Sequence, residues 1–201
     1  MKNDVYVLAH EVKNPLCVIK GYLEMINPIN LQEYKKIIEN ELIDSIEILD
    51  NYLEYNQLKI NKEEIDITLL LSEIKSQMLP ILRKRGIKFK IQNIDNEIYL
   101  EADYNKLKQV FYNIIKNAYE AEAKNIFISY RIIYDKIEIK IENDGIKIID
   151  PTLLGNNYSN KVLGHGIGTT LSKKIIMLHN GKIEYFNDKK YVNCLITLPL
   201  K

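Results

Sequence analysis

Two runs of apolar residues with three- or four-residue spacing occupy the N-terminal part of the chain. The first run consists of Val5, Leu8, Val12, Leu16, Ile19, Leu23 and Ile26, and the second of Leu31, Tyr34, Ile38, Leu42, Ile46, Leu49 and Leu53. This spacing predicts two helices, each with a heptad-like apolar stripe. Between them, residues 27–30 read Asn-Pro-Ile-Asn and predict a short turn, so the helices should form an antiparallel hairpin. Because a single hairpin buries only part of each stripe, we expect two copies to pair into a four-helix bundle, as a homodimer.

From about residue 62 the pattern changes to short strands mixed with helices. Alternating and β-branched segments predict strands at 64–67, 87–92, 97–100, 125–134 and 136–143, and two final strands around a turn at 187–190. Helical spacing predicts helices at 69–85, from an N-cap at Asp103 to about Glu122, and at 168–179, whereas 144–163 is irregular. Strand hairpins without regular βαβ alternation favour an α+β sandwich. We therefore expect a helical hairpin in residues 1–60 and an α/β sandwich in residues 61–201.

Composition narrows the class of protein. The chain has 201 residues, of which 46% are hydrophobic and 27% charged, the balance of an ordinary globular protein. Its net charge of +1 offers no basic surface for nucleic acid or an anionic membrane. No apolar run approaches the ~18–20 residues of a membrane span, and no signal peptide is recognisable. The two cysteines, Cys17 and Cys194, lack metal-ligand spacing, so we expect reduced thiols in a cytoplasmic protein.

The first candidate for chemistry is His10, which lies in the first predicted helix between the stripe residues Leu8 and Val12. Its imidazole should therefore reach solvent beside the packed face. Glu11 can accept a proton from the imidazole and leave the other ring nitrogen nucleophilic. Pro15 removes the amide that would bond to the carbonyl of Glu11, so we expect the helix to bend or loosen there.

Two segments further along the chain contain residues that could bind a cation and an anion. Asn113 and Asn117 share one face of a predicted helix, and amide oxygens can ligate Mg²⁺. The sequence Gly-x-Gly-x-Gly at 164–168 precedes another helix, where glycine backbone and free amide groups favour a phosphate. Either segment alone is a weak signal, because asparagine is abundant here and a glycine-rich stretch can be only a flexible loop.

These segments together resemble the conserved boxes of bacterial sensor histidine kinases. His10-Glu11-Val12-Lys13-Asn14-Pro15-Leu16, followed by Gly21-Tyr22, is similar to the H-box, and residues 109–118 are similar to the N-box. Residues 164–168 resemble the G2 box, and residues 158–161 resemble the lid segment before it. The boxes follow the order of the family over about residues 4–200, and that order is far more specific than any single box.

The resemblance implies roles for individual residues. His10 would accept the phosphoryl group, Glu11 would assist as base, and Asn14 would position water for dephosphorylation of a partner response regulator. The implied cofactors are ATP and Mg²⁺, with Asn117 as the metal ligand. The implied nucleotide-binding residues are Asn113, Lys116, Asn117, Asn143, Gly145, Lys161, Gly164, Gly166, Gly168 and Thr169. His179 falls at a helix end where the family often has histidine, and we expect it to be structural.

The G1 box departs from the usual Asp-x-Gly-x-Gly of the family. Alignment on Gly145 places Asn143 at the aspartate that accepts the hydrogen bond of the adenine amino group, and Lys147 at the second glycine. Asp144 is one residue out of register. Asn143 can still accept through its carbonyl oxygen, but the bond should be weaker without a charge. Lys147 should reduce loop flexibility and could add a phosphate contact.

The function implied by the resemblance is that of a histidine autokinase, which transfers the ATP γ-phosphate to His10 and then to an aspartate of a response regulator. One alternative is an ATP-independent phosphotransferase that uses His10, which the small size and the altered G1 box favour. The glycine-rich segment and both asparagines count against it. A second alternative is a non-catalytic dimer that binds a regulator. Only nine residues precede His10, so we expect the input signal to come from a longer chain or from a partner.

Overall fold

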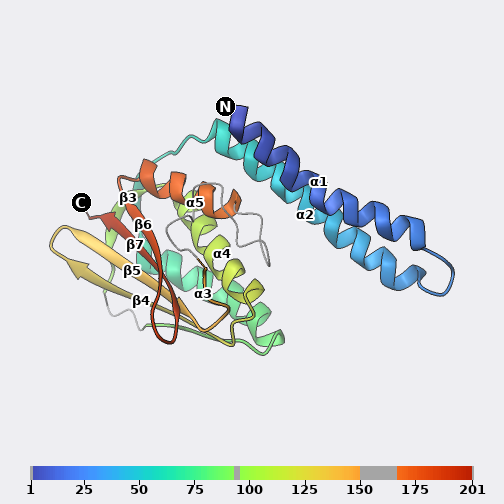
Figure 1. Cartoon of the computed structure of the whole chain (residues 1–201). Helices are drawn as coiled ribbons and strands as arrows, with labels where there is room; N and C mark the ends of the chain where they lie inside the picture. The colour runs from blue at the N-terminus through green and yellow to red at the C-terminus, as the bar shows by residue number, and fades with distance from the viewer. Residues whose placement is uncertain (1, 93–95, 150–166, 201) are drawn as a thin grey trace. The chain divides into compact units, whose positions relative to one another are not determined.

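The computed structural model describes residues 2–92, 96–149 and 167–200 (Figure 1). The chain divides into two compact units, Met1–Gln57 and Leu58–Lys201. The first contains helices α1 (Lys2–Met25) and α2 (Leu31–Gln57), which lie side by side as the predicted antiparallel hairpin (Figure 1).

Two asparagines form the turn between these helices. The side-chain oxygen of Asn27 accepts hydrogen bonds from the backbone N–H groups of Ile29 (2.9 Å) and Asn30 (3.2 Å). In return, Asn30 Oδ1 accepts from the N–H of Asn27 (2.7 Å), and its amide donates to the carbonyl of Met25 (3.0 Å). Asparagine side chains thus satisfy backbone groups that the end of α1 leaves without partners. The predicted turn is confirmed.

The hairpin covers little of its own apolar surface. Of the side chains described between residues 8 and 57, only Pro15, Ser45 and Ile48 are buried. Five residues of the second predicted stripe remain between 41% and 56% exposed, namely Leu31, Leu42, Ile46, Leu49 and Leu53. The α1 helix is not interrupted at Pro15, whose ring is buried.

The second unit is a sandwich of helices on a sheet (Figure 1). Its strands are β1 (Glu63–Asp66), β2 (Lys88–Ile91), β3 (Tyr99–Ala102), β4 (Asn125–Ile133), β5 (Lys136–Asn143), β6 (Lys182–Asn187) and β7 (Val192–Pro199). Five of them form a sheet in the order β2-β4-β5-β7-β6, and β1 pairs with β3 in a separate small sheet. Only β2 and β4 pair in parallel among these described strands.

The helices of this unit are α3 (Ile67–Lys84), α4 (Tyr104–Glu120) and α5 (Ile167–Leu178). They pack on one face of the sheet because the strands alternate: Ile137, Ile139 and Ile141 of β5 are fully buried, and charged residues lie between them. The predicted α+β sandwich is therefore the observed architecture.

Aspartates start two of the helices. Asp66 precedes α3 and accepts a hydrogen bond from the N–H of Thr68 (2.8 Å). Asp103 precedes α4, where it accepts from the N–H of Lys106 (3.1 Å), which confirms the predicted N-cap. Each carboxylate satisfies an amide group at a helix N-terminus, where the helix dipole also favours negative charge.

His179 ties the end of α5 to the start of α4. Its Nε2 accepts a hydrogen bond from the N–H of Asp103 (2.8 Å), and its Nδ1 lies 2.8 Å from the carbonyl oxygen of Ile175. Only a neutral ring protonated at Nδ1 satisfies both contacts. The side chain is 1% exposed, and burial lowers the pKa of His179 below its ordinary 6.5. This geometry supports the structural role expected for His179.

Replacement of His179 by leucine should lower the free energy of unfolding by about 2–3 kcal/mol, because the N–H of Asp103 loses its acceptor in the protein interior. Wild-type stability should also fall as the pH drops below 6.5, since the unfolded chain then binds a proton that the folded ring resists. Urea unfolding at about pH 7.5 and about pH 5.5 measures both effects. His179→Leu should lose this part of the pH dependence, whereas His10→Gln, at an exposed position, should keep it. An unchanged pH dependence in His179→Leu would contradict the assignment.

Candidate functional site

His10 and Glu11 occupy different environments on α1. His10 is exposed, whereas Glu11 is half-buried and its Oε2 is enclosed without a hydrogen-bond partner among the described residues. Burial raises the pKa of Glu11 from 4.5 to about 7. A carboxyl group with this pKa can take up or release a proton near neutral pH, which suits a general base. Asn14 is exposed and follows His10 by four residues, so both lie on the same side of the helix.

The second predicted group of residues lies where α4 meets the beginning of α5. The amide nitrogen of Asn113 lies 3.4 Å from the carbonyl oxygen of Gly168 and 3.3 Å from the hydroxyl of Ser172, as a hydrogen-bond donor to both. Gly168 has no side chain, and a Cβ atom there would lie 3.6 Å from the Asn113 amide. Asn117 is exposed one turn further along α4. The structure thus brings Asn113 and Gly168 together, whereas Asn117 lies one helical turn away from this contact.

Two other predicted members of this group are less accessible. Lys116 is half-buried, and its ammonium group lies 3.8 Å from the carboxylate of Glu120. Thr169 is only 7% exposed. Three more predicted members, Lys161, Gly164 and Gly166, lie outside the described residues, as does the lid segment at 158–161.

The end of β5 approaches the end of α4 through Gly145. A Cβ atom at this position would lie 2.5 Å from the carbonyl oxygen of Ala121, so only glycine fits. The next residue, Ile146, donates its N–H to the same carbonyl (2.8 Å). Asn143 is 7% exposed, and its side-chain oxygen accepts a hydrogen bond from the N–H of Gly145 (3.0 Å). These contacts place Asn143 and Gly145 beside the C-terminal half of α4, which also carries Asn117.

Asp144 has a structural role that the sequence did not reveal. Its carboxylate accepts hydrogen bonds from the backbone N–H groups of Lys124 and Asn125 (2.8 Å each) and from the Asn125 side chain (2.6 Å). Burial alone would raise the pKa of Asp144, but these hydrogen bonds outweigh it and hold the pKa below 3.8. The carboxylate is therefore occupied at the start of β4.

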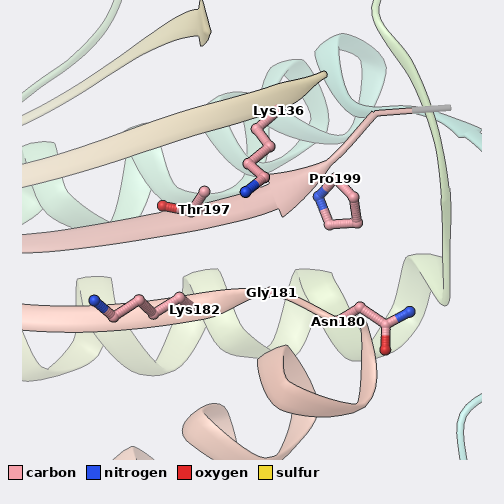
Figure 2. Close-up of a pocket in the computed structure, with 6 residues that line it drawn as sticks. All are labelled: Lys136, Asn180, Gly181, Lys182, Thr197 and Pro199. Carbon is pink, nitrogen blue, oxygen red and sulfur yellow. The ribbon is translucent and has the colours of Figure 1, made fainter. Parts of the chain in front are cut away.

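A shallow pocket lies at the other end of β5 (Figure 2). It is lined by Lys136, Asn180, Gly181, Lys182, Thr197 and Pro199. Lys136 begins β5 and Asn143 ends it, so the pocket is separate from the predicted nucleotide residues. The ammonium group of Lys182 already pairs with Glu184 (2.8 Å). The described residues contain no group of three His, Cys, Asp or Glu side chains suited to a metal ion, and no described helix is long and apolar enough to span a membrane.

Two known families match this chain, and each matched range contains one of the two groups of candidate residues. Residues 5–59 match the family described as "His Kinase A (phospho-acceptor) domain", and this range contains His10, Glu11 and Asn14. Residues 102–201 match the family described as "Histidine kinase-, DNA gyrase B-, and HSP90-like ATPase". The second range contains both asparagines of α4, the end of β5 and all of α5.

Individual proteins similar to this chain are also histidine kinases. The chain is 31% identical to sporulation kinase B of Bacillus subtilis (strain 168) over 206 residues, which cover 96% of this chain and 48% of that protein. It is also 31% identical to the signal transduction histidine-protein kinase AtoS of Escherichia coli (strain K12) over 198 residues, with 88% and 31% covered. The chain thus spans about half or less of the length of these two relatives.

Solved structures confirm the fold. Histidine kinase ThkA, in its complex with response regulator protein TrrA, matches with a TM-score of 0.85 and 26% identity, over 99% of this chain and 61% of that chain. Acinetobacter baumannii histidine kinase AdeS matches with a TM-score of 0.77 and 18% identity, over 96% and 98% of the two chains. At that lower identity the likeness concerns the fold alone.

Proposed function

The chain belongs to the bacterial two-component histidine kinase family and resembles its sporulation kinases, and on this premise we propose that it is a histidine autokinase. It transfers the γ-phosphate of ATP to His10 and then to an aspartate of a response regulator. The observation that carries this proposal is the exposed His10 followed directly by the half-buried Glu11, within the range 5–59 that matches the phospho-acceptor family.

The chemistry assigns one role to each member of the pair. Nε2 of His10 forms a bond to the γ-phosphorus while the bond from that phosphorus to the bridging oxygen of ADP breaks. The Nδ1 proton passes to the carboxylate of Glu11, so the product imidazole carries no net charge. In the second step, a carboxylate oxygen of the regulator forms a bond to phosphorus, the electron pair of the broken N–P bond returns to Nε2, and the proton held by Glu11 returns to Nδ1, so that His10 is again a neutral imidazole. Asn14 orients water for the reverse signal, dephosphorylation of the regulator.

The nucleotide binds around the C-terminal half of α4. Asn143 would accept the hydrogen bond of the adenine amino group, with Gly145 beside it, and Asn113, Lys116, Gly168 and Thr169 would serve the phosphate end. Lys161, Gly164 and Gly166 remain predicted members of the site. Catalysis of phosphoryl transfer rests mainly on such positioning and on charge neutralisation.

Magnesium suits the residues available. The exposed amide of Asn117 offers one oxygen ligand, and Mg²⁺ commonly takes one or two protein oxygens together with phosphate oxygens and water. Bound at Asn117, Mg²⁺ would offset the negative charge of the phosphate groups.

The two units have different roles in this proposal. Residues 1–60 form the dimerisation and phosphotransfer hairpin, and residues 61–201 form the ATP-binding domain. The ThkA neighbour was solved with a response regulator, which supports a receiver domain as the partner here. Both cysteines are free thiols, and a reducing, ATP-containing cytoplasm suits them.

The hairpin also supports a homodimer. Leu42, Ile46, Leu49 and Leu53 follow one another at helical spacing and are each at least 41% exposed. A contiguous apolar stripe of this kind is typical of an interface. A second hairpin that covers it completes a four-helix bundle.

A phosphotransferase that does not use ATP is the second candidate. The observation that favours it is the altered G1 box, in which Asn143 replaces a charged hydrogen-bond acceptor and Lys147 replaces a glycine. Such a protein would exchange phosphate between two regulators through His10.

Incubation with radiolabelled Mg-ATP tests the kinase directly. Wild type should acquire label from the γ-phosphate that is labile to acid and stable to alkali, because a phosphoramidate bond forms on His10. His10→Gln should acquire none, whereas Lys20→Ala, an exposed change on the same helix, should match wild type. Absence of label together with undetectable nucleotide binding would contradict the kinase and favour the phosphotransferase.

The role of Glu11 predicts a pH dependence. The base must be ionised, so the wild-type rate of autophosphorylation at saturating ATP should rise as the pH increases through about 7. Glu11→Gln should lower the rate about a hundredfold or more and should remove this rise, since the amide cannot accept the proton. Rates measured from about pH 5.5 to about pH 8.5 provide the test. A rise that persists unchanged in Glu11→Gln would show that another group is the base.

If the apolar stripe forms the dimer interface, a charged substitution in it should halve the molecular mass of the protein in solution. Ile46→Glu should convert the protein from dimer to monomer in light scattering at about 10 μM, because the substitution places a charge in the centre of the apolar stripe. Lys36→Glu, at an exposed polar position of the same helix, should remain dimeric. A wild-type protein that stays monomeric at every concentration would rule out this interface.

A further inference from the structure

The residues after Gly145 are held against the turn between β6 and β7 by two side chains, Lys147 and Asn187, which we call the turn clamp. The ammonium group of Lys147 donates hydrogen bonds to the carbonyl oxygens of Asp188 and Lys189, each at 2.9 Å. The amide of Asn187 bonds to both backbone groups of Ile148: it accepts from the N–H (3.3 Å) and donates to the carbonyl (2.6 Å).

The turn that receives Lys147 is itself well ordered by hydrogen bonds. The carboxylate of Asp188 accepts from the backbone N–H groups of Lys190 and Tyr191 (2.7 Å each). It also accepts from the side-chain amide of Asn193 (3.0 Å), which is fully buried in β7. The bonds from Tyr191, Asn193 and Lys190 lower the pKa of Asp188 to about 2. The two carbonyls that bind Lys147 are therefore fixed relative to the sheet.

With the turn clamp in place, every residue from Gly145 to Ile148 makes a hydrogen bond to another part of the domain or to Asn143. Gly145 donates its N–H to Asn143, and Ile146 donates its N–H to Ala121. Lys147 and Ile148 are then held at the turn. A loop attached in this way loses less conformational entropy when a ligand binds beside it than a free loop would.

We propose that Lys147 and Asn187 are positioning residues for the nucleotide, which hold Asn143 and Gly145 ready for the purine end of ATP. The proposal rests on the proposed function, which places the nucleotide at these residues. Lys147 then acts through the loop and not by contact with a phosphate, because its ammonium group is occupied by two carbonyls about forty positions away in the sequence. The lysine at this position thus orders the loop, where a glycine would leave it free.

Nucleotide affinity tests the clamp in the full chain. Lys147→Met should weaken binding of Mg-ADP and of a non-hydrolysable ATP analogue by the same factor, about tenfold, because the two charge-assisted hydrogen bonds that attach the loop to the turn are lost. Lys147→Arg should recover most of the affinity, since a guanidinium group can also donate to two carbonyls. Lys189→Met is the matched control, because it removes the same charge from the turn and leaves both carbonyls in place.

Kinetics and a second variant separate positioning from general destabilisation. The KM for ATP should rise in Lys147→Met while kcat for phosphorylation of His10 stays at the wild-type value, since saturating ATP restores the ordered loop. Asn187→Ala should weaken ADP binding as well. The double variant should lose less than the product of the two single effects, because both side chains hold the same segment.

Three outcomes would overturn the proposal. ADP affinity of Lys147→Met equal to that of Lys189→Met would show that the clamp does not position the nucleotide. Weaker binding of the ATP analogue alone would assign Lys147 to the γ-phosphate. Both results would leave the kinase intact, whereas a wild-type chain that binds no nucleotide would overturn the proposed function and the clamp with it.

Discussion

The close approach of two backbone segments at Gly145 is the constraint on which the candidate nucleotide site depends. The carbonyl of Ala121, just after α4, lies so near that a single methyl group at residue 145 would collide with it. This contact joins the end of β5 to the end of α4 and so sets Asn143 and Gly145 near the C-terminus of that helix. Asn113 then reaches Gly168 at the beginning of α5. The end of β5 thus meets the end of α4, and the beginning of α5 meets the middle of α4 at Asn113.

The two units differ in how completely they bury their own apolar side chains. The sandwich has a continuous apolar core, in which the buried His179 has both ring nitrogens engaged. The hairpin leaves much of its apolar stripe exposed, with Leu42, Ile46, Leu49 and Leu53 each at least 41% exposed. The exposed stripe fits the homodimer proposed above.

The altered G1 box illustrates how neighbouring residues offset a substitution. Asn143 lacks the charge of an aspartate, but its oxygen helps to order Gly145. Asp144 supplies a charge one residue later, which holds the start of β4. Lys147 lacks the freedom of a glycine, yet its long side chain attaches the loop to a turn that Asp188 and Asn193 already order. The chain therefore retains a defined loop without the usual residues of the box.

The local sequence pattern was enough to predict most of the secondary structure of this protein. Apolar spacing and turn residues predicted the hairpin, the strands and the Asp103 cap, because each of these depends on residues within a few positions of one another. The order of the boxes predicted the family. The tertiary structure alone decided the partners of His179, Asp144 and Lys147, whose contacts join residues 76, about 20 and about 40 positions apart. It also decided that Glu11 would be desolvated, because the pKa of a carboxyl group follows from what packs around it and not from its neighbours in sequence.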